Sequence, residues 1–175
     1  MKTKIVSLEH EVQGQMQGLG EKARAAYALM AEATNEQKDM ALVQSALALR
    51  EHATGIIAAN AKDMEGGKEK GLDAAMLDRL RLDEKRVEAM ARGLEDIEHL
   101  ADPIGTVLAE WTRPNGLVIQ RLRVPLGVIG IIYESRPNVT ADAGALCLKS
   151  SNAVILRGGS ESAESSAAIH ACLDQ

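Results

Sequence analysis

The sequence of 175 residues has no phenylalanine, and aromatic residues make up only 2% of it. A hydrophobic core must therefore be built from Ala, Leu, Ile, Val and Met, and an aromatic base-stacking surface is improbable. Basic residues are not in excess either, since twenty Lys and Arg stand against twenty-five Asp and Glu, for a formal net charge of −5. Because phosphate neutralisation requires a basic surface, we do not expect a nucleic-acid partner.

Cysteine and long apolar runs are also scarce. Cys147 and Cys172 are too far apart for a metal or redox spacing, so we expect reduced thiols of the core type and a cytoplasmic protein. The first residues lack the unbroken apolar stretch of a signal peptide, and the composition is far from that of a membrane protein. The four histidines follow no ligand spacing, and no metal site is expected. They are His10, His52, His99 and His170.

Proline is absent from the first hundred residues, and all four prolines lie between 103 and 137. Long helices exclude internal proline, whereas strands punctuated by turns tolerate it. We therefore divide the chain into an N-terminal helical segment over 1–102, a β-hairpin over 103–125, and an α/β part over 126–175.

Helical periodicity predicts three main helices in the first segment. The first covers about 9–32, with Met16, Leu19 and Ala23 on its apolar face. The second begins at a capping box of Thr34 and Gln37 and continues towards residue 60, with Met40, Val43, Leu47 and Ala48 on its apolar face. Gly66, Gly67 and Gly71 are expected to break the next segment. A further helix is capped by Asp83, with Val87, Met90 and Leu94 inward.

The remainder predicts a hairpin and two buried strands. Residues 106–111 and 117–123 flank the turn sequence Arg-Pro-Asn-Gly. Two apolar runs, at 127–133 and 153–156, lack alternation, which is typical of parallel strands covered on both faces. A helix over 140–149 separates them, another begins at Glu161, and Ser151 occupies a helix-to-strand position where glycine is expected.

The chemistry is expected at the carboxyl ends of these strands, because ligands of open α/β sheets bind there. The loop Arg157, Gly158, Gly159, Ser160 and Glu161 offers close backbone approach, a guanidinium for a phosphate, and a carboxylate for a ribose hydroxyl. A glycine turn capped by Ser160, with a solvated Arg157, is an equally valid interpretation, because the loop is not a G-x-G-x-x-G fingerprint.

The loop after the first buried strand, residues 134–138, contains two further candidate site residues, each with two interpretations. Asn138 is either a helix N-cap or turn residue after Pro137, or an amide donor that stabilises an oxyanion. Arg136 is either an anion ligand for substrate or cofactor, or a member of a surface ion pair.

Several stretches of the sequence resemble the γ-glutamyl phosphate reductase family, also called glutamate-5-semialdehyde dehydrogenase, within the aldehyde dehydrogenase superfamily. The resemblance covers most of the chain from about residue 56. General aldehyde dehydrogenases carry Pro-Trp-Asn after the first strand and Lys-Pro-Ser-Glu after the second, where this chain has Arg136-Pro137-Asn138 and Arg157-Gly158-Gly159-Ser160-Glu161. The stretches that carry the resemblance are 59–63, 71–72, 76–80, 100–105, 123–140, 145–150 and 152–160.

The resemblance implies an aldehyde dehydrogenase-like α/β fold with N-terminal helices, an oligomerisation hairpin and an incomplete Rossmann-type parallel sheet. It implies NADPH-dependent reduction of L-glutamyl 5-phosphate to L-glutamate 5-semialdehyde with phosphate release, in L-proline biosynthesis. Asn138 would stabilise the oxyanion, and residues 157–161 would hold the adenosine ribose of NADPH. The resemblance further implies a homo-oligomer and functional coupling to glutamate 5-kinase.

The family's nucleophilic cysteine belongs to a C-terminal domain, and neither Cys147 nor Cys172 matches it. We therefore expect only the N-terminal portion of such an enzyme, inactive and incompletely folded by itself. An alternative is a non-catalytic binding or assembly module derived from the same fold.

Overall fold

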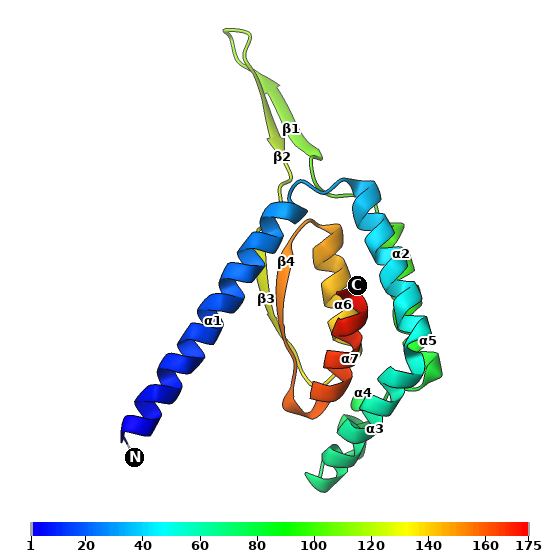
Figure 1. Ribbon diagram of the computed structural model, residues 1–175. Helices are drawn as coiled ribbons and strands as arrows, with labels where there is room; N and C mark the ends of the chain where they lie inside the picture. Colours follow the sequence, from blue (N-terminus) through cyan, green and yellow to red (C-terminus); the bar gives the residue numbers. More distant parts are fainter. Residues whose placement is uncertain (1, 175) are drawn as a thin grey trace.

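The computed structural model describes residues 2–174, with side chains from residue 11 onwards. Five helices come first: α1 (Lys2–Met30), α2 (Asn35–Glu51), α3 (Ala53–Glu69), α4 (Ala74–Leu80) and α5 (Glu84–Glu98). The strands β1 (Val107–Thr112) and β2 (Val118–Leu122) follow. The rest is β3 (Val128–Ile132), α6 (Asn138–Lys149), β4 (Ala153–Arg157), the short 3-10 helix η1 (Ser160–Ser162) and α7 (Ala163–Leu173) (Figure 1). The order confirms an α/β fold, while the exact domain boundaries remain a prediction.

Helix starts follow the local sequence closely. Thr34 and Gln37 form the predicted capping box of α2, and Asp83 accepts a hydrogen bond from the Arg86 backbone at the start of α5. The predicted single helix from 34 towards 60 is wrong, because α2 ends at Glu51 and α3 begins at Ala53. Periodicity does not reveal this break, because apolar residues recur at helical spacing in both α2 and α3.

The predicted helix break at Gly66 and Gly67 is also wrong, since α3 continues to Glu69. A β-carbon on Gly67 would lie 3.0 Å from a methyl group of Leu72, with Leu77 and Leu80 close by. Gly67 therefore permits close packing inside a helix and makes no turn. The chain turns at Gly71, whose φ of +75° suits glycine.

The hydrophobic core lies where α2 and α5 pack against α6 and α7. The predicted inner face of α5 is confirmed, with Val87, Met90 and Leu94 buried. The predicted inner face of α2 is confirmed only for Ala48, which is buried. Met40, Val43 and Leu47 are exposed, and the other core residues are Leu42, Ala46 and Leu49. Two neighbouring apolar stripes exist on α2, and only tertiary packing selects between them.

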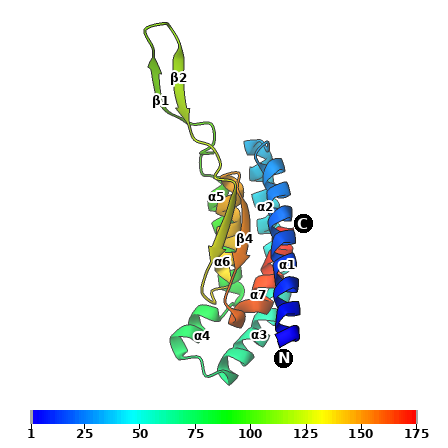
Figure 2. The ribbon, with the colours of Figure 1, turned by 90° about the vertical axis from the view of Figure 1, so that its left-hand side faces the viewer.

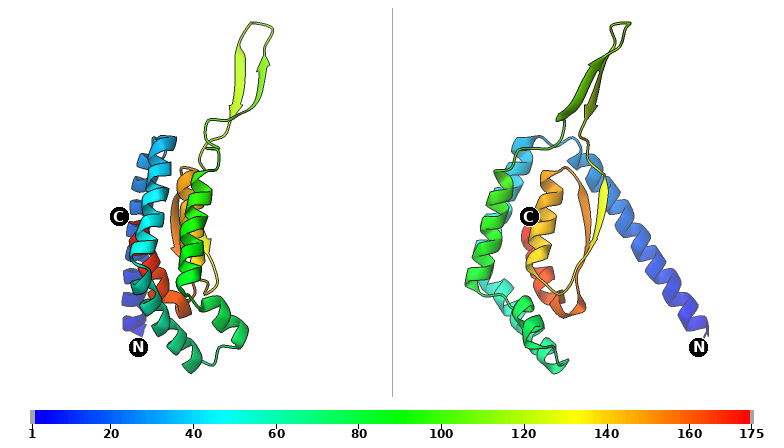
Figure 3. Two further views of the ribbon diagram at one scale, coloured as in Figure 1. Left: turned by 90° about the vertical axis from the view of Figure 1, so that its right-hand side faces the viewer. Right: turned by 180° about the vertical axis from the view of Figure 1, so that it is seen from behind.

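Helix α1 stands apart from this core and runs beside the β3–β4 ribbon (Figures 1 and 3). Of its predicted apolar face, Ala23 is buried, whereas Met16 and Leu19 are exposed. None of the helices between residues 2 and 174 combines the length and apolar character required to cross a membrane.

The strands form two separate two-stranded sheets. The predicted hairpin is confirmed: β1 and β2 pair antiparallel and project away from the rest of the molecule (Figures 1 and 2). The second sheet pairs β3 with β4 in parallel, as predicted, from Val128 opposite Ala153 to Ile132 opposite Arg157. Burial of β3 on both faces is not observed among the described residues, since Ile132 is 81% exposed.

Two buried lysines link α2, α5 and α6 near the point where the hairpin segment begins. Lys38 of α2 donates to Asp102 and, over 3.0 Å, to the Ser151 hydroxyl. Lys149 at the end of α6 donates to Asp39 and to the Glu98 carbonyl. Burial raises the pKa of Asp102, but hydrogen bonds from Lys38 and a backbone N–H outweigh it, so the net pKa lies below its usual value.

Candidate functional site

The loops after β3 and β4 meet at the carboxyl edge of the parallel sheet. Register brings them together, because Ile132 lies opposite Arg157 and the Tyr133 backbone N–H donates to the Arg157 carbonyl over 3.1 Å. The Tyr133 hydroxyl lies 2.8 Å from the Thr140 hydroxyl, which ties the first loop to the start of α6. This edge is where the sequence predicts the chemistry of the protein.

Gly158 and Gly159 let the two loops approach closely. A β-carbon on Gly158 would lie 3.1 Å from the Tyr133 ring, and one on Gly159 would lie 2.0 Å from the Ser135 hydroxyl oxygen. The backbone of Gly159 has a φ of −65°, so no left-handed conformation is involved. The glycine pair is therefore required by contact between the loops.

Glu161 is the polar centre of this contact. Its carboxylate accepts hydrogen bonds from Ser135 over 2.8 Å and from Ser160 over 2.9 Å, and Lys70 of the α3 terminus lies 3.7 Å away. The Ser135 bond, then a backbone N–H and the Ser160 bond, lower the pKa of Glu161 from 4.5 to about 2. A fixed anion therefore stands at the end of β4.

The capping interpretation of Ser160 is wrong, because its hydroxyl donates to Glu161 and the residue preceding η1 is Gly159. Arg157 is exposed, and among the described residues its guanidinium makes one long hydrogen bond, of 3.4 Å, to the neighbouring Gly158 carbonyl. This matches the solvated arginine of the structural interpretation. It also leaves most of the guanidinium donors available to a ligand.

Arg136 forms the surface ion pair that was one of its two interpretations. Its Nε lies 3.4 Å from the Glu134 carboxylate, and both side chains are exposed. Its binding of an anion stays a prediction.

The two loops and α4 line a cleft of about 640 Å³, called here the strand-end cleft. Helix α4 contributes Met76 and Arg79, and Arg79 pairs with Glu134 at 3.7 Å. Sequence reasoning missed Arg79 as a site residue. The signal was available, because residues 76–80 are one of the stretches that carry the family resemblance.

Asn138 begins α6 and does not cap it. Its side-chain amide donates to Asp142, one turn further along the helix, over 3.0 Å, and the residue before the helix is Pro137 with no capping bond. The N-cap interpretation is therefore wrong. Burial raises the pKa of Asp142, an effect that the hydrogen bond from Asn138 only partly offsets.

Asn138 and Asp142 line a second cleft, of about 280 Å³, between α6 and the α4–α5 segment. We call it the Asp142 cleft. Its other charged lining residues are Arg79, Arg81 and Arg86. Arg79 lines both clefts, so the two clefts adjoin at this side chain.

The two cysteines are buried as predicted, and burial raises the pKa of both thiols. A protonated, enclosed thiol is a poor nucleophile, so Cys147 and Cys172 serve packing. Among the residues whose side chains are described, no three His, Cys, Asp or Glu gather into a group that could hold a metal ion.

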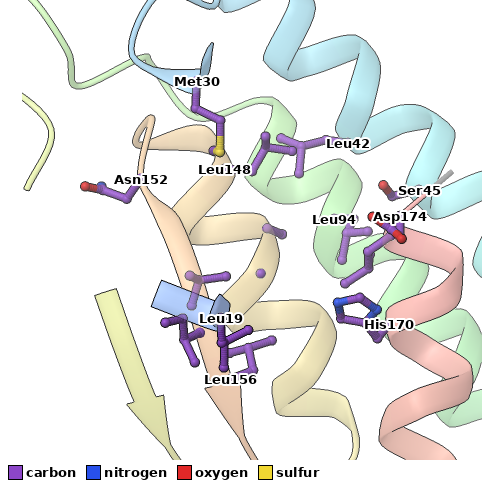
Figure 4. Close-up of a pocket in the computed structure, with 15 residues that line it drawn as sticks. Leu19, Met30, Leu42, Ser45, Leu94, Leu148, Asn152, Leu156, His170 and Asp174 are labelled. Carbon is purple, nitrogen blue, oxygen red and sulfur yellow. The ribbon is translucent and has the colours of Figure 1, made fainter. Parts of the chain in front are cut away.

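A further cavity of about 400 Å³ lies between α1, β4 and the α6–α7 pair. Its walls are mostly aliphatic, and Figure 4 shows Leu19 of α1 beside Leu156 of β4, with His170 and Asp174 towards α7. None of the predicted site residues lines it.

Comparison with known proteins places this geometry in a class. An acetylating aldehyde dehydrogenase from Geobacillus thermoglucosidasius superposes with a TM-score of 0.64 at 13% identity, over 95% of this chain and 35% of that chain. This likeness shows the fold alone. The architecture is that of the aldehyde dehydrogenases.

Closer matches define the family. A γ-glutamyl phosphate reductase of Rhodospirillum rubrum is 61% identical over 163 residues, which is 93% of this chain and 38% of the relative. That of Paramagnetospirillum magneticum is 65% identical over 154 residues, or 88% of this chain and 36% of the relative. The crystal structure of the Thermotoga maritima enzyme gives a TM-score of 0.85 at 42% identity, over 87% of this chain and 37% of that one.

The chain belongs to the γ-glutamyl phosphate reductase family and matches the N-terminal portion of its members. It spans about two fifths of the length of the curated relatives. No protein-family model matches the sequence.

Proposed function

We propose that this chain provides the oxyanion donor and the cofactor loops for reduction of L-glutamyl 5-phosphate to L-glutamate 5-semialdehyde, with release of phosphate, in L-proline biosynthesis. The relatives' names support the enzyme class. The observation that carries the proposal is the close meeting of the two strand-end loops, the first of which leads directly into α6 at Asn138.

The reaction requires a nucleophile and a group that stabilises negative charge. In the family, a cysteine thiolate attacks the acyl phosphate and phosphate leaves with the electrons of the broken C–O bond. Hydride then adds to the thioester, and breaking of the C–S bond releases the aldehyde and regenerates the thiolate. Because Cys147 and Cys172 are enclosed, that thiolate must come from elsewhere in the enzyme, and the 175-residue chain alone is expected to be inactive.

Asn138 is the proposed oxyanion donor. Negative charge develops on the carbonyl oxygen at each addition, and an amide held in place can donate to it without reorganising. One hydrogen of the Asn138 amide goes to Asp142, and the other is directed elsewhere in the same plane. Loss of such a donor costs about 3 kcal/mol of transition-state stabilisation.

The proposed cofactor is NADPH, which supplies the hydride. The residues present fit the adenosine end of such a cofactor: Gly158 and Gly159 allow close approach, and the exposed Arg157 has donors for an extra ribose phosphate. Ser160 and Glu161 are proposed to contact ribose hydroxyls, because the Glu161 carboxylate is ionised and two serines already hold it in place.

The hairpin is proposed to assemble copies of the protein into a homo-oligomer. An isolated two-stranded hairpin is marginally stable in water, and this one exposes a set of apolar side chains that association would cover. These residues are Val107, Leu108, Trp111, Leu117, Val118 and Leu122. A cytoplasmic location and functional coupling to glutamate 5-kinase belong to the same proposal.

The exposed hairpin also supports the alternative function, a non-catalytic assembly module. Such a module needs the hairpin and its apolar residues but not Asn138 or Arg157. The two functions therefore differ in which residues are required.

The test joins this chain to the remaining C-terminal part of the Rhodospirillum rubrum reductase and measures phosphate-dependent reduction of NADP⁺ by glutamate 5-semialdehyde. We expect activity from the joined protein and none from the 175-residue chain. Asn138→Ala should lower kcat by a factor of about 100 to 1000 with little change in NADPH affinity. Arg157→Ala should weaken NADPH more than NADH.

An Asn138→Ala variant with the kcat of the unchanged joined protein would contradict the oxyanion role. Equal losses of affinity for NADPH and NADH in Arg157→Ala would contradict the Arg157 assignment. A joined protein that folds and assembles but has no reductase activity would favour the assembly module.

A further inference from the structure

The Asp142 cleft contains charged groups that the proposed reaction does not use. Asp142 is the only carboxylate among its described lining residues, and three arginines lie around it. The cleft therefore offers one acceptor of a cation and several donors to an anion, next to the amide of Asn138.

Asp142 is incompletely satisfied. Its Oδ2 accepts from Asn138, whereas its Oδ1 points towards α5, 3.7 Å from where a β-carbon on Gly93 would lie. Among the described residues, no cation is paired with this carboxylate, although it is half-buried. Burial raises its pKa, and an ammonium ligand would supply the positive charge that the carboxylate lacks in this structure.

The three arginines differ in how far they are already engaged. Arg86 donates to the Asp78 carboxylate over 2.9 Å and to the Arg81 carbonyl over 2.8 Å, so it holds the α4–α5 turn. Arg81 is exposed and reaches Asp78 and Asp83 only at 3.6 and 4.0 Å. Arg79 lines the strand-end cleft as well, where the cofactor is proposed to bind.

We propose that the Asp142 cleft recognises the α-amino-acid end of the substrate, with Asp142 binding the α-ammonium group and Arg81 binding the α-carboxylate. This assignment rests on the proposed function, whose substrate is a glutamyl group. Arg81 is chosen over Arg79 because the amino-acid end must lie away from the cofactor.

The two groups lie close together on one face of α6. The Asn138 amide nitrogen is 3.0 Å from Oδ2 of Asp142, which leaves the second amide hydrogen of Asn138 and Oδ1 of Asp142 for a ligand. In a glutamyl group, the carbonyl oxygen at C5 and the ammonium at C2 stand at opposite ends of a short flexible chain. An oxygen bound at Asn138 and an ammonium bound at Asp142 can thus belong to one substrate molecule.

The test uses the joined reductase, with no cofactor added, and isothermal titration with three probes. L-Glutamate carries both groups, glutarate lacks the ammonium, and 4-aminobutyrate lacks the α-carboxylate. We expect L-glutamate to bind more tightly than either analogue by a factor of about 10 to 100. Asp142→Asn should remove most of the preference over glutarate, and Arg81→Gln most of the preference over 4-aminobutyrate.

Matched controls make the same charge changes outside the cleft: Asp96→Asn on the exposed face of α5 and Arg121→Gln on β2. Both should bind L-glutamate as the unchanged joined reductase does. If Asp142→Asn fails to fold by circular dichroism, the exposed Arg81 variant and the analogue comparison on the unchanged joined reductase still decide the outcome.

Equal binding of L-glutamate and glutarate would overturn the proposal, as would an Asp142→Asn variant with undiminished preference, or no binding of L-glutamate. If Asp142 serves only to orient Asn138, the Asp142→Asn substitution should change the affinities for glutamate and glutarate by the same factor. The proposed function fails separately if the joined reductase is inactive while the glutamate preference persists. If that reductase is active but the preference is absent, the cleft assignment alone fails.

Discussion

Ser135 stands so close to Gly159 that a β-carbon on the glycine would lie 2.0 Å from the serine hydroxyl oxygen. The Ser135 backbone nitrogen would lie 3.1 Å from the same β-carbon. Rotation of the serine side chain would remove only the first of these contacts. The two strand-end loops are therefore packed against each other through the backbone.

Gly159→Ala should consequently destabilise the chain by about 1 to 3 kcal/mol, the usual cost of overpacking a close contact. The free energy of unfolding, measured by urea denaturation, checks this. Gly55→Ala on α3 is the control, because nothing lies within 4 Å of its added β-carbon. It should be stabilising by about 0.5 to 1 kcal/mol, since alanine is the better helix former. Equal effects at the two positions would refute the contact.

The Glu161 carboxylate should make stability depend on pH in the acid range. Its pKa in the folded chain is about 2, below the usual 4.5, so the folded state favours the ionised form. The stabilisation is complete above about pH 4.5 and is lost as the pH falls towards 2. Denaturation midpoints between pH 6 and 2 should decline less in Glu161→Gln than in the unchanged chain.

The exposed Glu65 on α3 offers the control for this measurement. Glu65→Gln should keep the pH profile of the unchanged chain. Identical acid profiles for Glu161→Gln and the unchanged chain would show that the hydrogen bonds from Ser135 and Ser160 do not stabilise the carboxylate.

Lys38 should contribute strongly to stability, because its ammonium is only 2% exposed and pairs with Asp102. Lys38→Met leaves Asp102 and the Ser151 hydroxyl without their partner, and we expect a loss of about 3 kcal/mol. Thermal unfolding measures it. Lys62→Met, which removes an exposed 3.9 Å pair with Glu164, should cost less than about 1 kcal/mol. Similar losses for both lysines would contradict the assignment.

Ser151 adopts a φ of +56°, in the left-handed region that favours glycine. Its hydroxyl also accepts a hydrogen bond from Lys38. Ser151→Ala loses the hydrogen bond and keeps the strain, whereas Ser151→Gly loses the bond and relieves the strain. The glycine variant should therefore be more stable than the alanine variant by about 1 kcal/mol. Equal unfolding free energies would argue against strain at this residue.

Prediction from the sequence succeeded where the signal is local. Thr34 and Asp83 cap helices as their side chains dictate, and the Pro-Asn turn places the hairpin. It failed for the inner face of α2, where Met40 and Leu42 both lie on apolar stripes, because the choice depends on α5 and α6. It also failed at Gly67, whose role depends on Leu72 across the turn.

The candidate site also combines residues that the sequence predicts with residues that only tertiary packing brings together. The loop residues Arg157 and Glu161 follow from the order of strands and helices, since parallel strands bring their carboxyl ends together. The positions of Arg79 and Arg81 beside Asn138 and Asp142 do not follow from the sequence. The α4 segment and α6 are about sixty residues apart, and only packing places them around one cleft.

The amino-acid sequence by itself determined the fold class, the start of most helices, the parallel pairing of β3 and β4, and the family, since each depends on local patterns or on contiguous motifs. Tertiary structure decided which apolar stripes are buried and which arginines surround Asn138 and Asp142. These depend on contacts between residues distant in the chain, whose free energy exists only when the helices pack.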